Sequence, residues 1–200
     1  MKKFFVIAFA LIISIATFAQ DGYQVGSIVK DFKLKNVDGK MVSMADYKEA
    51  EGLIIIFTCN TCPFSVATEE RVKELDKKYA AQGYPVVAIN PNDAVRRPGD
   101  SFDEMVQRAK EYEYTFAYLH DATQEIATEW GATRTPHVYL LKKEDKGFKV
   151  AYIGAIDDST MNPDNVDETY LEAASAALKA GKQPDPNLTK AIGCTIKWAQ

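Results

Sequence analysis

The sequence predicts an α/β fold in which helices cover both faces of a central mixed β-sheet. Segments with strand-like and helix-like patterns alternate along the chain, as they do in folds of this class. Two strand-like segments, 53–57 and 85–89, are apolar throughout, which is typical of strands buried on both faces. The length of 200 residues, with 46% hydrophobic and 26% charged residues, fits a single globular domain.

An N-terminal β-hairpin is the first expected element. Residues 32–37 alternate between apolar and polar side chains, Asp38-Gly39 is a strong hairpin turn signal, and residues 41–44 supply the second strand. The later elements are expected in the order strand 53–57, helix 63–82, strand 85–89, a helix capped at Ser101, strand 116–119, helix 123–130, strand 137–141, strand 148–153 and helix 166–180.

The helices are predicted from the spacing of apolar residues and from signals at their ends. In the helix over 63–82, Val72 and Leu75 fall on one face, and Gly83 ends the segment. Ser101 followed by Glu104 fits a capping box at the start of the next helix.

The N-terminus has the features of an export signal. Lys2-Lys3 form a short positive region, residues 4–18 are apolar, and Ala19 offers a small residue for cleavage. We therefore expect a signal peptide over 1–19 and one domain over 20–200, located in the periplasm or secreted, with no stable membrane insertion after cleavage. The alternative is an uncleaved anchor in the inner membrane, although the apolar stretch is short for a span of about 20 residues.

The charge of the chain argues against nucleic-acid partners. The formal net charge is −4 at pH 7, and basic residues do not gather into a stripe. Such a stripe is the electrostatic footprint of nucleic-acid binding, so we expect no nucleic-acid partner.

The most informative motif is Cys59-Asn60-Thr61-Cys62, which lies between strand 53–57 and the helix that follows Pro63. A thiol at a helix N-terminus meets unpaired N–H groups and the positive end of the helix dipole, and both favour its thiolate. The thiolate is the form that attacks disulfides, so the motif indicates thiol redox chemistry.

Two other interpretations of the cysteine pair stay open. An inert structural disulfide would leave the third cysteine, Cys194, unpaired. A zinc site needs four ligands, and only Cys194, His120 and His137 remain to complete one.

The motifs together resemble the thioredoxin superfamily, and more closely its redoxin branch. This branch includes the alkyl hydroperoxide reductase/thiol-specific antioxidant group and the extracytoplasmic thiol-disulfide oxidoreductases. The resemblance covers about residues 24–198 and implies a thioredoxin-like fold. It rests on a buried strand followed by Cys-x-x-Cys-Pro, on Thr135-Pro136 before an apolar strand, and on the stretches 58–63, 87–93, 154–159 and 193–198.

The resemblance implies roles for the site residues. Cys59 matches the exposed nucleophile and Cys62 the resolving cysteine, so the redox group would be a Cys59–Cys62 disulfide with no bound cofactor and no metal. Pro136 matches a proline that follows a cis peptide bond. The backbone of Thr135 beside it is expected to bind an extended substrate segment by strand addition.

Three further residues are candidate modulators of the cysteine pair. Asn60 and Thr61 lie between the cysteines, and both are neutral and polar. His137 directly follows Pro136; it either favours the thiolate of Cys59 or, as a strand residue, points away from it.

Departures from the family pattern leave parts of the mechanism open. Leu53 stands where thioredoxin has a buried acid, so Glu129, Glu69 and water remain candidate proton acceptors for Cys62. Gly52 and Ile56 replace the proline and the threonine or serine that precede the peroxidatic cysteine of peroxiredoxins, which disfavours a peroxidase.

The function predicted from the sequence is therefore that of an exported thiol-disulfide oxidoreductase, with the reduction of partner disulfides as the favoured direction. Its partners would be protein thiols and disulfides, with a membrane redox relay as electron source. The alternatives are a thiol peroxidase and a Cu(I) carrier that uses Cys59 and Cys62, with His137 as a further candidate ligand. Cys194 is expected to be buried with the C-terminal tail packed on the domain; a role as third redox partner is the alternative.

Overall fold

The computed structural model of the protein describes residues 22–200. The expected signal segment 1–19 lies outside the described residues, so its cleavage stays a prediction. Within the described range, no helix combines the length and the apolarity needed to cross a lipid bilayer.

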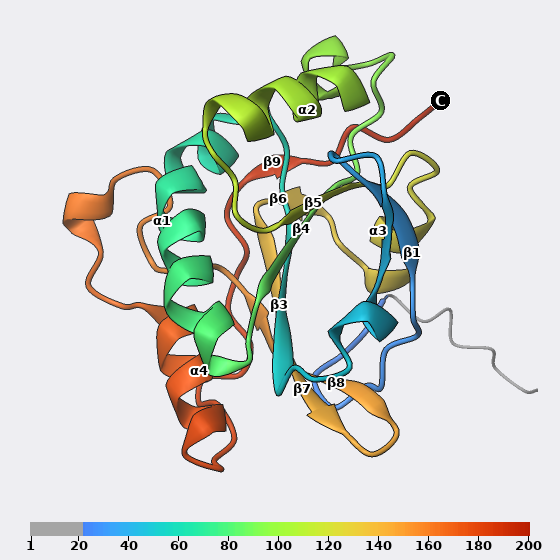
Figure 1. Cartoon of the computed structure of the whole chain (residues 1–200). Coiled ribbons are helices and arrows are strands. Elements are labelled where there is room, and N and C mark those ends of the chain that lie inside the picture. Colours follow the sequence, from blue (N-terminus) through green and yellow to red (C-terminus); the bar gives the residue numbers. More distant parts are fainter. Residues whose placement is uncertain (1–21) are drawn as a thin grey trace, which may run out of the picture.

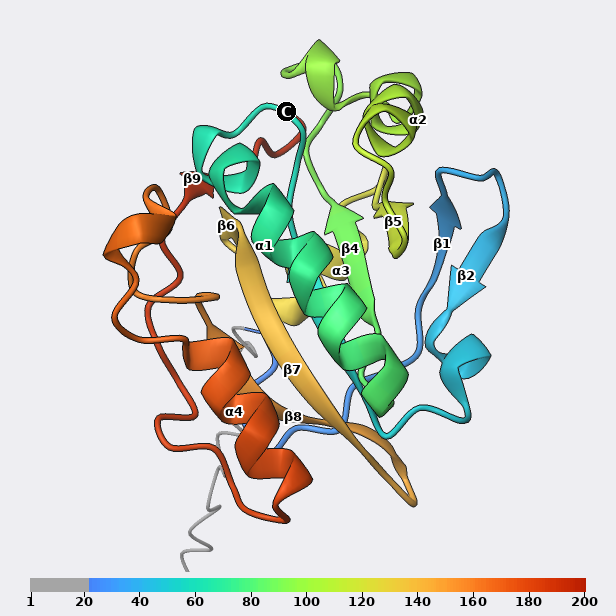
Figure 2. The same ribbon diagram turned by 60° about the vertical axis from the view of Figure 1, so that its left-hand side comes forward.

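A seven-stranded mixed sheet forms the centre of the domain, in the order β2-β1-β5-β4-β3-β7-β8 (Figure 2). The pairs β3–β4 and β4–β5 are parallel, and the other neighbours are antiparallel. The predicted mixed sheet and its N-terminal hairpin are thus confirmed. The strands are β1 (Lys33–Asn36), β2 (Met41–Ser43), β3 (Gly52–Phe57), β4 (Val86–Asn90), β5 (Ala117–His120), β7 (His137–Glu144) and β8 (Gly147–Gly154).

Helices cover both faces of this sheet, as the sequence predicts. The helices α1 and α4 lie side by side on one face, and the short α3 lies on the other (Figure 1). The helices are α1 (Pro63–Tyr79), α2 (Phe102–Glu111), α3 (Glu125–Trp130) and α4 (Tyr170–Lys179), with short 3-10 turns at Met44–Tyr47, Ala80–Gln82, Pro98–Asp100 and Pro163–Asn165.

Strand β3 supplies side chains to two separate cores, which explains why every residue in it is apolar. Leu53 and Phe57 pack into the core that includes Trp130 of α3. Ile54 and Ile56 pack into the core on the opposite face, beneath α1, α2 and α4. Successive strand residues point to opposite faces, so a strand at the centre of a doubly covered sheet has no solvent side.

The C-terminal tail forms a strand that the sequence did not predict. Strand β9 (Cys194–Thr195) pairs antiparallel with β6 (Arg134–Thr135), and the two make a separate small sheet. Each strand has two residues, which is too short for a periodic pattern to reveal.

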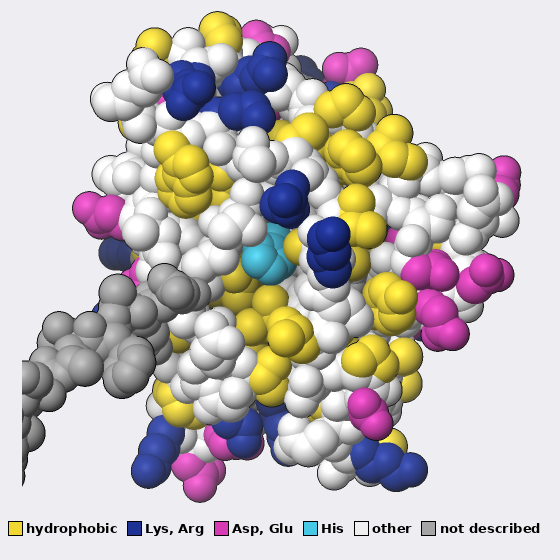
Figure 3. All heavy atoms as spheres, turned by 180° about the vertical axis from the view of Figure 1, so that it is seen from behind, with side chains coloured by type: hydrophobic (Ala, Val, Ile, Leu, Met, Phe, Trp, Pro, Cys, Tyr) yellow, Lys and Arg dark blue, Asp and Glu magenta, His cyan; other side chains and the backbone are white. Residues whose placement is uncertain are grey.

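The surface carries no single dominant charge on the face opposite to that of Figure 1. Figure 3 shows Lys and Arg side chains there in small separate groups among apolar and acidic ones. A nucleic acid would need a continuous basic stripe, and this face presents none.

Candidate active site

The turn between β3 and α1 carries the two cysteines of the Cys-x-x-Cys motif. Strand β3 ends at Phe57, and Cys62 is the N-cap residue of α1, with Pro63 at the first helical position. Proline suits that position because the N–H that it lacks would have no partner in the helix. All three cysteines of the chain are free thiols in this structure.

A buried carboxylate holds this turn in place. Asp100, which is fully buried, accepts hydrogen bonds from the backbone N–H groups of Asn60 and Thr61 at 2.7 and 3.0 Å. It also accepts one from the Thr61 hydroxyl at 2.8 Å and one from the Asn92 side-chain amide at 2.7 Å. Hydrogen bonds to a charged group are stronger than neutral ones, so Asp100 fixes the path of the chain between the cysteines.

The Asn60 side chain adds two further anchors to this turn. Its amide donates to the carbonyl of Gly99 at 2.9 Å, and its carbonyl accepts from the Tyr118 hydroxyl at 2.8 Å. Asn60 and Thr61 therefore shape the turn through hydrogen bonds to other parts of the fold. Sequence reasoning missed Asp100 and Tyr118, because nothing local marks a carboxylate in a loop or a tyrosine in a strand as a partner of this turn.

The Thr135-Pro136 segment lies directly against both cysteines. The bond between these two residues is cis, as the resemblance implied. The Cys59 sulfur lies 3.3 Å from the Thr135 hydroxyl, and the Cys62 thiol donates to the Thr135 carbonyl at 3.2 Å. The structure thus brings together four of the residues that the sequence singled out.

The expectation that Cys59 is the exposed cysteine is wrong for this structure. Cys59 and Cys62 are each 4% exposed. Cys59 is covered by Thr135 and by Ser65 of α1, whose hydroxyl accepts from the Cys59 thiol at 3.9 Å. Exposure therefore does not distinguish the two cysteines.

Electrostatics does distinguish them, and it favours a thiolate on Cys62. A hydrogen bond from Cys59, together with one from Cys194 and the backbone N–H of Ser65, lowers the pKa of Cys62 to about 4. The same pairing with Cys62, burial and the nearby Asp100 raise the pKa of Cys59. Ser65 is in the first turn of α1, so part of this preference is the helix N-terminus acting on its cap residue.

Of the two roles considered for His137, stabilisation of a cysteine thiolate is not supported by its surroundings. Its Nδ1 accepts from the backbone N–H of Thr133, and its ring packs against Tyr139. Burial and the neighbouring Arg134 lower the pKa of His137 to about 4, so the ring is neutral near pH 7. A neutral ring supplies no positive charge that would stabilise a thiolate.

The two proposed acidic proton acceptors are engaged elsewhere. Glu69 accepts from both the Nε and an Nη of Arg108, at 3.0 and 2.7 Å, and pairs with Tyr114. Glu129 forms an ion pair with Lys30 at 2.8 Å and accepts from the Tyr23 hydroxyl at 2.7 Å. Neither carboxylate is left to take a proton from Cys62.

The backbone edge expected to bind substrate is filled by the chain itself. In the pairing of β6 with β9, Thr135 is the register partner of Cys194. The tail packs on the domain as expected, and Ile196 is buried. Cys194, however, is only partly buried. Burial and the contact with Cys62 raise the pKa of Cys194 to about 11.

The described residues offer little for a metal ion. Within 22–200, no three or more His, Cys, Asp and Glu side chains are grouped so that they could hold one.

Comparison with known proteins places the chain in a family. Residues 25–151 match the model of the AhpC/TSA family. The protein belongs to the AhpC/TSA family. This finding confirms the resemblance to the redoxin branch of the thioredoxin superfamily.

Its curated relatives include peroxiredoxin Q and a thiol-disulfide oxidoreductase. It is similar to peroxiredoxin Q of Triticum aestivum, with 26% identity over 53% of this chain and 45% of that protein. It is also similar to the thiol-disulfide oxidoreductase ResA of Geobacillus thermodenitrificans, with 25% identity over 63% of this chain and 68% of that protein. The chain thus spans about half the length of the peroxiredoxin Q relatives it matches.

Solved structures confirm the thioredoxin-like α/β fold. An uncharacterised conserved protein from Geobacillus kaustophilus is 37% identical, with a TM-score of 0.80 over 88% of this chain and 93% of that one. A hypothetical protein from Sinorhizobium meliloti is 34% identical, with a TM-score of 0.80 over 89% and 96%. A thiol:disulfide interchange protein DsbE structure from Chlorobium tepidum, at 21% identity and a TM-score of 0.53 over 65% of this chain and 84% of that one, shares the fold.

The lowered pKa of Cys62 predicts a pH-dependent difference in stability between the protein and its Cys62→Ser variant. The unfolded chain keeps this proton up to the ordinary value of 9.0, whereas the folded chain loses it near pH 4. The Cys62 contribution to the free energy of unfolding therefore grows as pH rises through this window and is lost as pH falls through about 4. We expect the protein to gain stability over its Cys62→Ser variant across the window, measured by urea unfolding under reducing conditions.

Cys59→Ser tests the cause of the shift, because the interaction with the Cys59 thiol is the largest contribution that lowers the pKa of Cys62. We expect the stability of this variant to rise less with pH than that of the unchanged protein. A stability difference between the protein and Cys62→Ser that stays constant with pH would show that Cys62 is not the thiolate.

Proposed function

We propose that the protein is a thiol-disulfide oxidoreductase whose reactive group is the thiolate of Cys62, with Cys59 as its redox partner. The observation that carries this proposal is the position of Cys62. It caps the N-terminus of α1, where unpaired backbone N–H groups and the helix dipole favour a thiolate, and its sulfur lies 3.2 Å from the carbonyl oxygen of Thr135. Membership of a family with thiol-disulfide oxidoreductase relatives supports the same chemistry.

The reaction proceeds by two thiol–disulfide exchanges. The Cys62 thiolate attacks one sulfur of a partner disulfide, so that a mixed disulfide forms and the other partner sulfur leaves as a thiolate. Cys59 then gives up its proton to that leaving thiolate and attacks the Cys62 sulfur, which releases the reduced partner and forms the Cys59–Cys62 disulfide. In the opposite direction, the same mixed disulfide forms when a partner thiolate attacks the oxidised pair. Protein thiols and disulfides are thus the proposed substrates, and the two sulfurs carry the electrons without a bound cofactor.

The assignment of roles within the pair can be tested by trapping. A Cys59→Ser/Cys194→Ser variant keeps the attacking cysteine, Cys62, at the helix N-terminus but lacks a thiol to resolve the intermediate. We expect it to accumulate covalent complexes with a disulfide-bonded test protein such as insulin, visible on non-reducing gels. The matched Cys62→Ser/Cys194→Ser variant should form none. The opposite pattern would restore Cys59 as the nucleophile.

The stabilised thiolate also bears on the direction of electron flow. The sequence analysis favoured a reductant. A lowered pKa of Cys62, however, stabilises the reduced form of the cysteine pair and so makes its disulfide a stronger oxidant. We therefore propose that the pair donates its disulfide to partner thiols.

In a Cys194→Ser background, we expect the reduction potential of the Cys59–Cys62 pair to lie above the value of about −270 mV for thioredoxin, toward the value of about −120 mV for DsbA. Equilibration with glutathione buffers measures it. A potential at or below that of thioredoxin would support the reductant that the sequence favoured.

A thiol peroxidase is the second candidate, and the similarity to peroxiredoxin Q favours it. Here the Cys62 thiolate would attack a peroxide oxygen, which breaks the O–O bond, releases an alcohol or water and leaves a sulfenic acid on Cys62. The Cys59 thiol would then attack that sulfur, forming the disulfide with loss of water. Peroxide consumption by the reduced protein, compared with insulin reduction, separates the two activities.

We propose further that the protein is exported and exchanges electrons with a membrane redox relay. The support is the positive and apolar N-terminal segment, because disulfide exchange suits compartments outside the cytoplasm. We expect the mature protein to begin at Gln20 and to fractionate with the periplasm or the medium, as measured by N-terminal sequencing of the expressed full-length chain. A retained residue 1–19 segment in a membrane fraction would indicate an anchor instead.

A further inference from the structure

The C-terminal strand lies where a substrate strand would be expected to bind. Strand β9 is paired with β6 next to the cis bond, and Cys194 is directly opposite Thr135. Register partners in an antiparallel pair have Cα atoms about 4.5–5.5 Å apart. The chain thus places a cysteine of its own beside the edge that lines the Cys59–Cys62 pair.

Hydrogen bonds on both sides of Cys194 hold the tail in this position. The N–H of Ile196 donates to the carbonyl of Thr133 at 3.2 Å, and Arg134 donates to the carbonyl of Gly193 at 3.0 Å. Lys197 donates through its backbone N–H to the Asn92 side chain at 2.9 Å. The position of Cys194 is therefore built into the fold.

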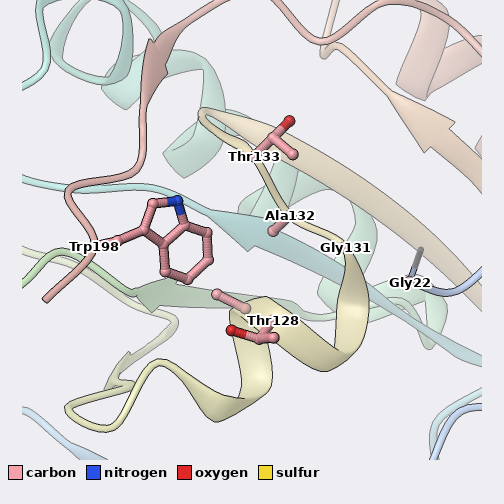
Figure 4. Close-up of a pocket in the computed structure, with 7 residues that line it drawn as sticks. Gly22, Thr128, Gly131, Ala132, Thr133 and Trp198 are labelled. Carbon is pink, nitrogen blue, oxygen red and sulfur yellow. The ribbon is translucent and has the colours of Figure 1, made fainter. Parts of the chain in front are cut away.

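Side-chain packing anchors the end of the tail. Ile196 is 3% exposed. Figure 4 shows the Trp198 indole directed toward Thr128 of α3, in a hollow that Ala132 and Thr133 also line. An aromatic ring seated against a helix supplies binding energy that a two-residue strand lacks.

Gly193 lets the tail approach closely enough for this contact. A Cβ atom at Gly193 would lie 2.2 Å from the Thr135 carbonyl oxygen and 2.6 Å from its carbonyl carbon. Only a residue without a side chain fits there, so the approach of the tail to the active-site backbone depends on glycine.

Two other cysteines lie next to Cys62. Cys59 precedes it in the same turn before α1, and Cys194 on the tail lies opposite Thr135, near enough to affect the pKa of Cys62. Cys62 also donates to the carbonyl of Thr135, the residue that pairs with Cys194. Either neighbour is placed to exchange with a disulfide at Cys62.

We propose that Cys194 is a third catalytic cysteine, which attacks the Cys62 sulfur and forms a Cys62–Cys194 disulfide. The inference rests on the proposed function, because it extends the same exchange chemistry to a second resolving thiol. In this proposal, strand β9 acts as an internal substrate, because it pairs with the same backbone edge that an external substrate strand would use.

The exchange is balanced within the chain. The Cys194 thiolate attacks the Cys62 sulfur of the Cys59–Cys62 disulfide, a Cys62–Cys194 bond forms, and the Cys59–Cys62 bond breaks. Cys59 leaves with the electron pair and takes up the proton that Cys194 released. No external oxidant is needed, because one disulfide replaces another. When Cys62 is bound to a partner, the same attack releases the partner as a thiolate.

The direct test uses a Cys59→Ser variant of the full chain, treated with oxidised glutathione. Glutathione first forms a mixed disulfide with Cys62, and Cys194 then displaces it. We expect mass spectrometry of the alkylated, digested protein to show a Cys62–Cys194 cross-linked peptide and little retained glutathione. A stable glutathione adduct on Cys62 with Cys194 fully alkylated would overturn the inference.

Two variants control for position and for non-specific oxidation. Gly193→Ala in the Cys59→Ser background keeps all the sulfur chemistry but pushes the tail off Thr135, so the cross-link should fall about tenfold or more in rate. Cys62→Ser should show no link between Cys59 and Cys194. Circular dichroism checks that the Gly193→Ala variant is folded. An unchanged cross-linking rate in the folded variant would show that the pairing of β9 with β6 does not contribute to the reaction.

A second measurement separates this inference from the proposed function. Cys59→Ser with Cys194 intact should trap about tenfold less insulin than Cys59→Ser/Cys194→Ser, because Cys194 resolves the mixed disulfide. Equal trapping by both would overturn the role of Cys194 and leave the proposed function standing. No trapping by either variant, with the glutathione-driven cross-link intact, would overturn the proposed function and leave the third cysteine standing.

Discussion

The buried carboxylate of Asp100 is the constraint on which the rest of the site depends. It accepts hydrogen bonds from the backbone of both residues between the cysteines and from the Thr61 hydroxyl. A buried carboxylate without partners would be costly, so the turn and the loop that carries Asp100 stabilise each other. The same group raises the pKa of Cys59, so that one interaction both shapes the turn and favours the thiolate on the other cysteine.

Thr135 is the point at which distant parts of the chain meet. Its hydroxyl contacts Cys59, its carbonyl accepts from Cys62, and its backbone pairs with Cys194. Three segments, the turn before α1, the strand β6 and the C-terminal tail, thereby place three sulfurs around one residue. The arrangement explains why both cysteines of the motif are buried, since the site is covered by the chain itself.

The relatives of the protein include peroxiredoxin Q and the thiol-disulfide oxidoreductase ResA. Peroxide reduction by a cysteine and disulfide exchange both begin with a thiolate. What differs is the group that the thiolate meets. A peroxide needs only a small opening, whereas a protein disulfide needs a backbone edge on which to lie. In this chain that edge carries β9, so access to Cys62 and the position of the tail are physically linked.

The α/β architecture and the place of the Cys-x-x-Cys motif before α1 could be predicted from the amino-acid sequence, and the family resemblance implied the cis bond before Pro136. These features follow from local patterns: apolar periodicity, helix-end signals and motif spacing. The support of the turn by Asp100 and the position of Cys194 opposite Thr135 became visible only in the folded chain. Asp100 lies 40 residues from Asn60 in sequence, and Cys194 pairs with Thr135 through a strand of two residues. Contacts of this kind leave no periodic signal, because they depend on where whole elements pack and not on the residues next to them in the chain.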